Sequence, residues 1–300
     1  MRSFFSYSNL TLLLVAIFAC NNVAGQDSIS HRKMADVSLN FGGGAFSNSH
    51  YSFKELKSFF PESEILKEMS GSGESYPLND MNGFSGAQLT FGVFSPGRGI
   101  ISSKHLTGWR FGISYMSLNL LDYYSYSEKS FRLDTLFNQN GDVVSVRDSV
   151  FSYNRTLKFR SGLMSIESSY LIRFNGDKRW SYYLGLGGYC GMTLQNEMLL
   201  DESVYSGIKT INVQNGNEYT VSWKEENGNK TELKQVSPGF AAGGFIPFGL
   251  DFKFTRKPRG FDFLHLFIEG RTGMNFIQTS GLRTSIGTTV FMSFGFRTIL

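Results

Sequence analysis

The segment that decides the fold is Trp180–Gln195, WSYYLGLGGYCGMTLQ. In an extended strand, successive side chains point to opposite faces. One face of this strand would carry Trp, Tyr, Leu, Leu, Gly, Cys, Met and Leu, and the other would carry Ser, Tyr, Gly, Gly, Tyr, Gly, Thr and Gln. The apolar face must therefore pack either against a second sheet or against lipid.

The same alternation recurs along the chain, and clusters of Gly, Pro and Asn separate the alternating segments. These segments predict eight strands, at about 36–46, 83–94, 106–122, 155–174, 179–195, 239–255, 261–277 and 284–300. Each is long enough to cross a membrane as a tilted strand, which needs roughly 9–11 residues.

The opposite face of these strands carries small and charged residues. A soluble sandwich would turn this face to water, but the strands contain much Gly, little Lys and bulky rings near their ends. This composition favours an all-β fold, an eight-stranded antiparallel transmembrane β-barrel with its apolar side chains facing lipid. The side chains expected inside are those of Arg110, Glu167, Arg173, Asp251, Lys253, Glu269, Arg271 and Arg297.

The interior of an eight-stranded barrel is just wide enough for side chains to fill it, so a diffusion pore is disfavoured. An unpaired buried charge would be costly, and we therefore expect Glu167 and Glu269 to lie between arginines. The main interpretation is a polar plug that fixes the strand register. A gate or a ligand site is the alternative.

Connection lengths alternate between short and long, which is typical of outer-membrane barrels with short periplasmic turns and long extracellular loops. An even strand count then places both termini in the periplasm. The short links are Ser95–His105, Asn175–Lys178 and Arg256–Gly260, and the long ones are Ser47–Asn82, Tyr123–Asn154 and Asn196–Pro238; the last hairpin, Gln278–Arg283, is short but lies on the long-loop side.

The long loops have predicted structure of their own. Asn140-Gly141 is a hairpin signature between arms of nearly equal length, which indicates a ribbon extending beyond the membrane. The first loop reads as short amphipathic helical turns over Phe53–Phe59 and Pro61–Met69. Loop aromatics are candidates for recognition, namely Tyr126, Tyr153, Tyr205, Tyr219 and Trp223.

The N-terminus has the charged, apolar and small-residue order of an export signal. We predict a signal peptide over 1–25, a periplasmic segment over 26–35 and the barrel over 36–300. Acylation of Cys20 as a lipoprotein is the alternative. The net charge of +4 is scattered, so no nucleic-acid partner is expected, and no run of about 18 apolar residues follows the signal.

The residues that could support catalysis are sparse. His31 and His105 fall at the periplasmic end, His50 lies above the first strand, and His265 is expected to be luminal. No Cys or His spacing suits a metal, and no cofactor motif is present, so we predict a protein that is not an enzyme. A membrane-embedded hydrolase of lipid or peptide centred on His50 or His265 remains open, as does a narrow channel.

The export signal, the eight alternating strands and the C-terminal run VFMSFGFRTIL (290–300) resemble small outer-membrane β-barrels of the OmpA/OmpX kind. The Gly- and Phe-rich texture with large outer loops is most similar to PorT-type barrel proteins of Bacteroidetes. The resemblance covers about 36–300, although this chain ends on Ile299-Leu300 rather than on an aromatic residue.

This resemblance implies outer-membrane lipid as the surroundings and insertion by the barrel-assembly machinery. Its PorT-type part also suggests envelope or secretion proteins as partners. The predicted function is therefore a non-enzymatic, plugged outer-membrane barrel that acts through its extracellular loops in binding, envelope assembly or secretion.

Overall fold

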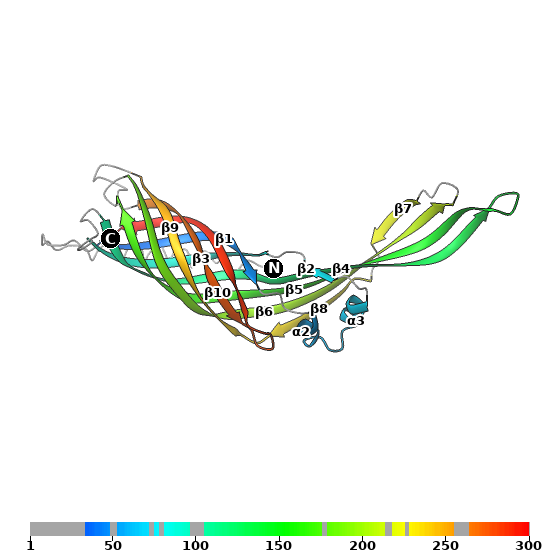
Figure 1. The fold of residues 1–300 in the computed structure, drawn as a ribbon, viewed down its shortest axis with the longest axis horizontal. Coiled ribbons are helices and arrows are strands. Elements are labelled where there is room, and N and C mark those ends of the chain that lie inside the picture. Colours follow the sequence, from blue (N-terminus) through cyan, green and yellow to red (C-terminus); the bar gives the residue numbers. More distant parts are fainter. Residues whose placement is uncertain are drawn as a thin grey trace, which may run out of the picture.

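The computed structural model describes residues 34–48, 53–71, 75–77, 81–96, 105–175, 179–213, 218–225, 228–254 and 264–299 (Figure 1). Two helices, α2 (Phe53–Lys57) and α3 (Glu64–Gly71), lie in the first long loop. The strands are β1 (Met34–Asn48), β2 (Ser75–Pro77), β3 (Met81–Pro96), β4 (His105–Phe137), β5 (Val143–Phe174), β6 (Trp180–Asn212), β7 (Glu218–Glu225), β8 (Lys230–Val236), β9 (Gly239–Lys253), β10 (Leu264–Gln278) and β11 (Ser285–Ile299). No helix in these ranges is long and apolar enough to cross a membrane.

Eight of the strands close into a ring of antiparallel neighbours, in the order β1, β3, β4, β5, β6, β9, β10 and β11. Strand β11 pairs back onto β1, so the ring has no free edge. The predicted eight-stranded barrel is confirmed. The main difference lies in length, because β4, β5 and β6 contain 33, 32 and 33 residues.

The alternation in the opening segment separates the two faces of the barrel wall. The side chains of Trp180, Leu184 and Leu186 are 59%, 51% and 69% exposed on the outside, whereas Ser181 and Tyr183 are buried inside. No second sheet in the described chain covers the outer face, so a sandwich is excluded. An uncovered apolar belt around a closed ring is the arrangement of a membrane barrel.

Glycines on the inner face let neighbouring strands approach closely. A Cβ atom at Gly191 would collide with the carbonyl oxygen of Met164, and one at Gly295 would collide with that of Leu39. These collisions are with backbone and cannot be relieved by turning a side chain. The high glycine content therefore follows from the curvature of a narrow barrel.

Strands β4, β5 and β6 continue past the ring and form an arm that projects from one end of the barrel (Figure 1). Strands β4 and β5 stay paired from the ring to Phe137 opposite Val143, with shifts in register before Leu121, Asp134 and Phe137. Strands β7 and β8 add to the outer part of β6. The predicted ribbon is confirmed, and Gly141 takes a φ of 84° in its terminal turn.

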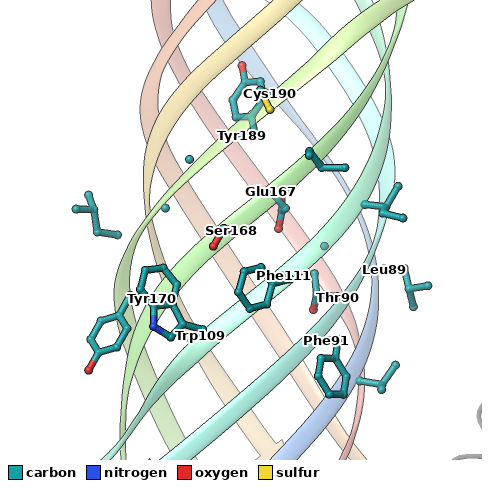
Figure 2. A pocket seen from close by; sticks show the side chains of 17 residues that line it. Leu89, Thr90, Phe91, Trp109, Phe111, Glu167, Ser168, Tyr170, Tyr189 and Cys190 are labelled. Carbon is teal, nitrogen blue, oxygen red and sulfur yellow. The ribbon is translucent and has the colours of Figure 1, made fainter.

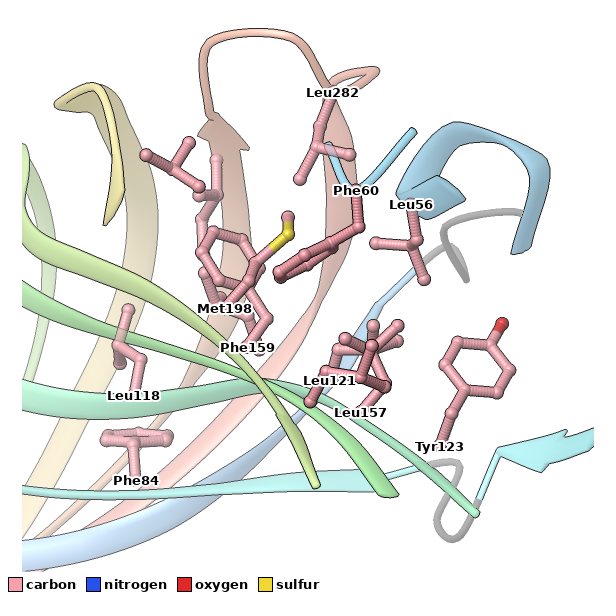
Figure 3. Packing of buried hydrophobic residues seen from close by; sticks show 14 of the residues in the cluster. Leu56, Phe60, Phe84, Leu118, Leu121, Tyr123, Leu157, Phe159, Met198 and Leu282 are labelled. Carbon is pink, nitrogen blue, oxygen red and sulfur yellow. The ribbon is translucent and has the colours of Figure 1, made fainter. Parts of the chain in front are cut away.

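The first loop folds over the end of the barrel from which the arm emerges (Figures 1 and 3). Leu56 from α2 and Ile65 and Leu66 from α3 are buried in an apolar cluster with residues from the barrel rim and the arm, including Phe159 and Met198. We call this segment, residues 53–71, the cap. The predicted helical turns are confirmed, but the second begins at Glu64, because the Ser63 hydroxyl caps it by accepting a bond from the Leu66 amide.

Strand β5 shows where the lipid-facing part ends. Towards the short turns, Met164 and Ile166 point outward and are exposed, and Ser165 and Glu167 point inward. Past Ser161 the chemistry inverts, since Leu157 and Phe159 point inward and are fully buried, while the outward residues are polar, namely Thr156, Lys158 and Arg160. The outer face therefore changes from a lipid-facing to a water-facing composition near residues 160–163.

Candidate functional site

The inner wall of the barrel carries a polar network centred on Glu269, whose side chain is fully buried. Arg110 donates to its two carboxylate oxygens at 2.5 and 3.0 Å, and Arg271 donates from Nε at 2.6 Å. The Tyr183 hydroxyl donates a further bond at 2.6 Å. Glu269 thus lies between two arginines, and its charge is fully satisfied.

Glu167 extends this network across the barrel. Its carboxylate accepts bonds from Arg271 Nη1 at 2.8 Å and Nη2 at 3.3 Å. Among the described residues Arg271 is its only arginine partner, so the expectation that Glu167 lies between two arginines is wrong, whereas that for Glu269 is met. Arg271 also donates to Gln88 at 2.6 Å, and Gln88 accepts from Asn40 at 2.9 Å. The contacts therefore connect β10 to β5, β3 and β1 through the middle of the barrel.

A second charged cluster lies nearer the short turns. Asp251 accepts bonds from Arg297 and from His265 Nδ1, the latter at 2.5 Å. Asp36 accepts from Arg173 at 3.0 Å, and its carboxylate lies 3.4 Å from Arg297 Nε. The charges of two carboxylates and two guanidinium groups thus balance in this cluster. They also balance in the network around Glu269, which contains two glutamates and two arginines.

The structure places the eight predicted luminal residues as follows. Seven have side chains that are at most 6% exposed, and Lys253 is half-buried; the seven are Arg110, Glu167, Arg173, Asp251, Glu269, Arg271 and Arg297. Sequence reasoning missed Asp36, Asn40, Gln88 and Tyr183 as network members. The sequence did contain the information, because all four occupy positions on the polar face of the alternating pattern in their strands.

The filled lumen leaves little space for a passage. Between the polar network and the cap cluster is a void of about 50 Å³, lined by Tyr189, Phe245, Phe291 and other residues. A void of this size holds one or two waters. Beyond it, Phe84 and Phe291 stack at 5.5 Å between centroids within the apolar cluster that the cap completes. A hydrated ion would have to displace both the polar network and this apolar cluster to pass.

The histidines in the described residues offer an incomplete catalytic arrangement. His265 forms an Asp–His pair with Asp251, but its Nε2 atom has no hydrogen-bond partner, so no hydroxyl or thiol nucleophile is aligned there. His105 packs edge-on against Phe174 at 4.6 Å. His31 and His50 lie outside the described residues, within which no group of three or more metal ligands occurs.

The arm presents two faces, defined by the strand register. Residues directly opposite one another share a face. Tyr126 lies opposite Asn154, Tyr205 lies opposite Ser152, and Trp223 lies opposite Gly207. Asn154 and Ser152 are two residues apart on β5, as Tyr205 and Gly207 are on β6, so each of these pairs also shares a face. The structure therefore brings Tyr126, Tyr205 and Trp223 onto one surface, which we call the aromatic face.

Tyr153 belongs to the other surface, which we call the cap face. Its ring lies between Lys129, at 5.0 Å from the centroid, and Arg155, at 4.9 Å. Tyr219 lies in β7, but its side chain is outside the described residues. The five predicted recognition residues thus do not form a single patch.

The aromatic face has fixed hydrogen-bonding groups beside its rings. The Tyr126 hydroxyl donates to Glu128 at 2.9 Å and lies 3.1 Å from Ser152 Oγ, and the Tyr124 hydroxyl donates to Asn154 at 2.8 Å. Tyr126 and Trp223 remain 46% and 48% exposed. Rings held in place but still open to solvent are the chemistry of a recognition surface.

Arg155 joins the arm to the cap and is only 1% exposed. Its Nε donates to Glu202 on β6 at 2.6 Å and its Nη1 to Ser127 on β4 at 2.8 Å, while its Nη2 pairs with Glu68 on α3. One guanidinium group therefore holds three arm strands and the cap helix in a single arrangement.

The outer wall of the barrel contains a hollow of about 1140 Å³ over strands β3 to β6 (Figure 2). Exposed side chains form its walls, among them Phe91, Trp109, Phe111, Ile166 and Leu186. Ser168, Gly188 and Cys190 also line it, together with inward-facing neighbours such as Glu167 and Tyr189. The hollow was not predicted, since it depends on how four strands combine.

No protein-family model and no curated protein matches this chain. It is similar to the solved structure of Neisserial surface protein A (NspA), with 11% identity over 88% of this chain and 97% of that chain and a TM-score of 0.31. For Ail, the attachment invasion locus protein of Yersinia pestis, the identity is 11% over 88% and 98% of the two chains, with a TM-score of 0.25. For the outer membrane protease OmpT of Escherichia coli, it is 9% over 91% and 99%, with a TM-score of 0.27. The fold assignment therefore rests on the strand pairing of this chain.

Proposed function

We propose that this protein is a non-enzymatic outer-membrane barrel whose arm binds another envelope or secretion protein at the cell surface. The observation that carries the proposal is the arm, an antiparallel extension of the barrel wall held to the cap by Arg155. Beyond Leu118, β4 continues to Phe137, a reach of about 60 Å at roughly 3.3 Å per residue. A structure of this kind is suited to presenting a surface away from the membrane.

The closed lumen supports a role outside the barrel. Ion pairs fill its middle and an apolar cluster fills the mouth below the cap, which speaks against transport through the ring. Within the described chain no nucleophile is bonded to His265 Nε2, so no observation specifically supports an enzyme. The arm is the largest part of the described chain that neither faces lipid nor fills the barrel.

The proposed orientation places the short turns in the periplasm and the arm outside. Short turns on the periplasmic side are the rule for outer-membrane barrels. The cap, whose apolar residues close the arm end, would then shield the lumen from the exterior. Proteolysis of intact cells should cut the arm but leave the ring, and a chain cut only after outer-membrane permeabilisation would contradict this orientation.

Site-specific photo-crosslinking in intact cells tests the binding role directly. A crosslinker at Tyr126 or Trp223 should give one adduct of defined mass from the aromatic face. A matched crosslinker at Ile208, exposed at 43% on β6 and opposite Ser149 on the cap face, serves as the control. An identical adduct pattern at all three positions, or none at the two aromatic positions, would overturn the proposal. Conductance steps in planar bilayers that vanish in Glu167→Gln would instead support a channel.

A further inference from the structure

The hollow in the outer wall faces the region that the alternation assigns to lipid (Figure 2). We propose that it is a binding site for an acyl chain of a phospholipid. Its volume of about 1140 Å³ is slightly above the usual range for ligand pockets, roughly 300–1,000 Å³. This site is separate from the arm and goes beyond the proposed binding role.

Two small residues, Ser168 and Gly188, lie on the floor of the hollow, and Gly244 continues their row beyond it. Phe111 on β4 lies opposite Ser168 on β5, Ser168 lies opposite Gly188 on β6, and Gly188 lies opposite Gly244 on β9. Directly opposite residues share a face, so the outer wall drops from a ring at Phe111 to three minimal side chains. The surrounding side chains stand higher, with Ile166 and Leu186 exposed at 62% and 69%.

The packing of the barrel accounts for only part of this low floor. A Cβ atom at the outward Gly244 would find its nearest neighbour at 3.8 Å, an ordinary contact, whereas one at the inward Gly191 would collide with backbone. At Gly188 a Cβ atom would lie 3.2 Å from the Gly243 carbonyl oxygen, a tight contact with backbone that itself favours glycine, whereas Ser168 already has a Cβ atom. Packing therefore favours glycine at Gly188 but does not require the small residues beside it, Ser168 and Gly244.

The position of the hollow commits it to a hydrocarbon occupant. Within the membrane there is no water to expel, so the hydrophobic effect does not drive binding. Binding there depends on close van der Waals packing. A concave surface makes more of those contacts with a flexible chain than the flat wall beside it. Ser168 adds a hydroxyl that can donate to an ester carbonyl at the same place.

Aromatic side chains close the end of the hollow nearer the short turns. The Trp109 ring packs edge-on to Tyr170 at 5.4 Å and stacks on Phe111 at 6.3 Å. Trp and Tyr prefer the level of lipid headgroups, where their polar atoms remain hydrated. In the proposed orientation this end faces the periplasmic leaflet, which consists of phospholipid, and the choice of phospholipid over lipopolysaccharide rests on that orientation.

Native mass spectrometry of the full chain, extracted from its membrane in mild detergent, tests the site. The wild-type protein should retain about one phospholipid per chain after the other bound lipids have been removed by activation. Ser168→Leu fills the floor without changing the backbone, and occupancy should fall at least fivefold. Thr272→Leu is the matched control, because it makes the same kind of change at an exposed outward position on β10, outside the hollow.

Two further results complete the test. Trp109→Ala removes a wall instead of filling the floor, so it should also reduce retention, and the heat-dependent gel shift of each variant shows whether the barrel has formed. Equal retention in wild type, Ser168→Leu and Thr272→Leu would overturn the site, as would retained lipopolysaccharide in place of phospholipid. Loss of retention leaves the arm crosslinks unchanged, so failure of one proposal can be told from failure of the other.

Discussion

The barrel interior and the mouth below the cap are both buried, yet opposite chemistry fills them. Ion pairs such as Arg110 with Glu269 fill the first, and Leu66, Phe159 and other apolar side chains fill the second. Strand β5 passes through both regions with its inward parity unchanged. What changes is the medium outside, because the ring faces lipid and the arm base faces water.

This contrast shows that the solvent outside decides the chemistry inside. Alternation leaves only one face of each strand for polar residues, and in the ring the outer face is committed to lipid. The inner face must then hold the polar side chains that distinguish one register from another. Above the ring, water takes the polar face, and the inner face is free to build an ordinary apolar core.

The largest expected effect comes from breaking the luminal network. Glu269→Ala leaves Arg110 and Arg271 buried without their shared partner, and losing one member of a buried ion pair costs about 3–5 kcal/mol. The midpoint of urea unfolding in detergent should fall accordingly. Glu197→Ala, which removes an exposed carboxylate bonded to Gln235, is the control and should change little. Equal midpoints for the two variants would show that the network is not needed for stability.

A smaller and more local effect is expected in the cap. Leu66 is fully buried, and truncating a buried Leu to Ala costs about 2–5 kcal/mol. Here the loss should fall on the docking of the cap rather than on the barrel. Hydrogen exchange in 53–71 should accelerate while exchange in β9 and β10 stays unchanged. If Leu66→Ala destabilised the ring as much as Glu269→Ala does, the two regions would form a single cooperative core.

How far these regions could be predicted depends on their medium. Alternation and turn residues were sufficient for the ring, including the inward placement of Glu167 and Arg271, because lipid on one side forces a strict parity. The cap helices were also predicted, but their docking into the mouth was not. The amphipathic pattern of a helix such as α3 does not indicate which surface the helix packs against. The length of β6 was missed because Gln195 adopts a φ of 54° at an irregularity in the register, where alternation breaks.

Arg155 tests how strongly the cap and the arm are coupled. Arg155→Met keeps the apolar stem but removes the bonds to Glu202, Ser127 and Glu68. Hydrogen bonds to charged groups contribute about 1.5–3 kcal/mol, so exchange should accelerate in the arm and in α3 together. Arg132→Met, which removes a half-exposed pair with Asp148 near the tip, is the control and should affect the arm alone. Unchanged exchange in α3 would mean that the apolar cluster holds the cap by itself.

The smallest effect is expected at Asp122, which lies on the arm just past the ring. Partial burial raises the pKa of its carboxyl group, although Lys158 and Arg160 act in the opposite direction. A carboxyl whose pKa is higher in the folded state opposes folding while it is ionised, and this cost disappears as the pH falls through the folded-state pKa. Asp122→Asn should therefore stabilise the arm at pH 7 by a few tenths of a kcal/mol, a small value because the site is half-exposed. The gain should vanish in hydrogen-exchange measurements near pH 3. A destabilised Asp122→Asn arm at pH 7 would mean instead that attraction to Lys158 outweighs burial, and that the water-facing side of the arm base depends on ion pairs as the lumen does.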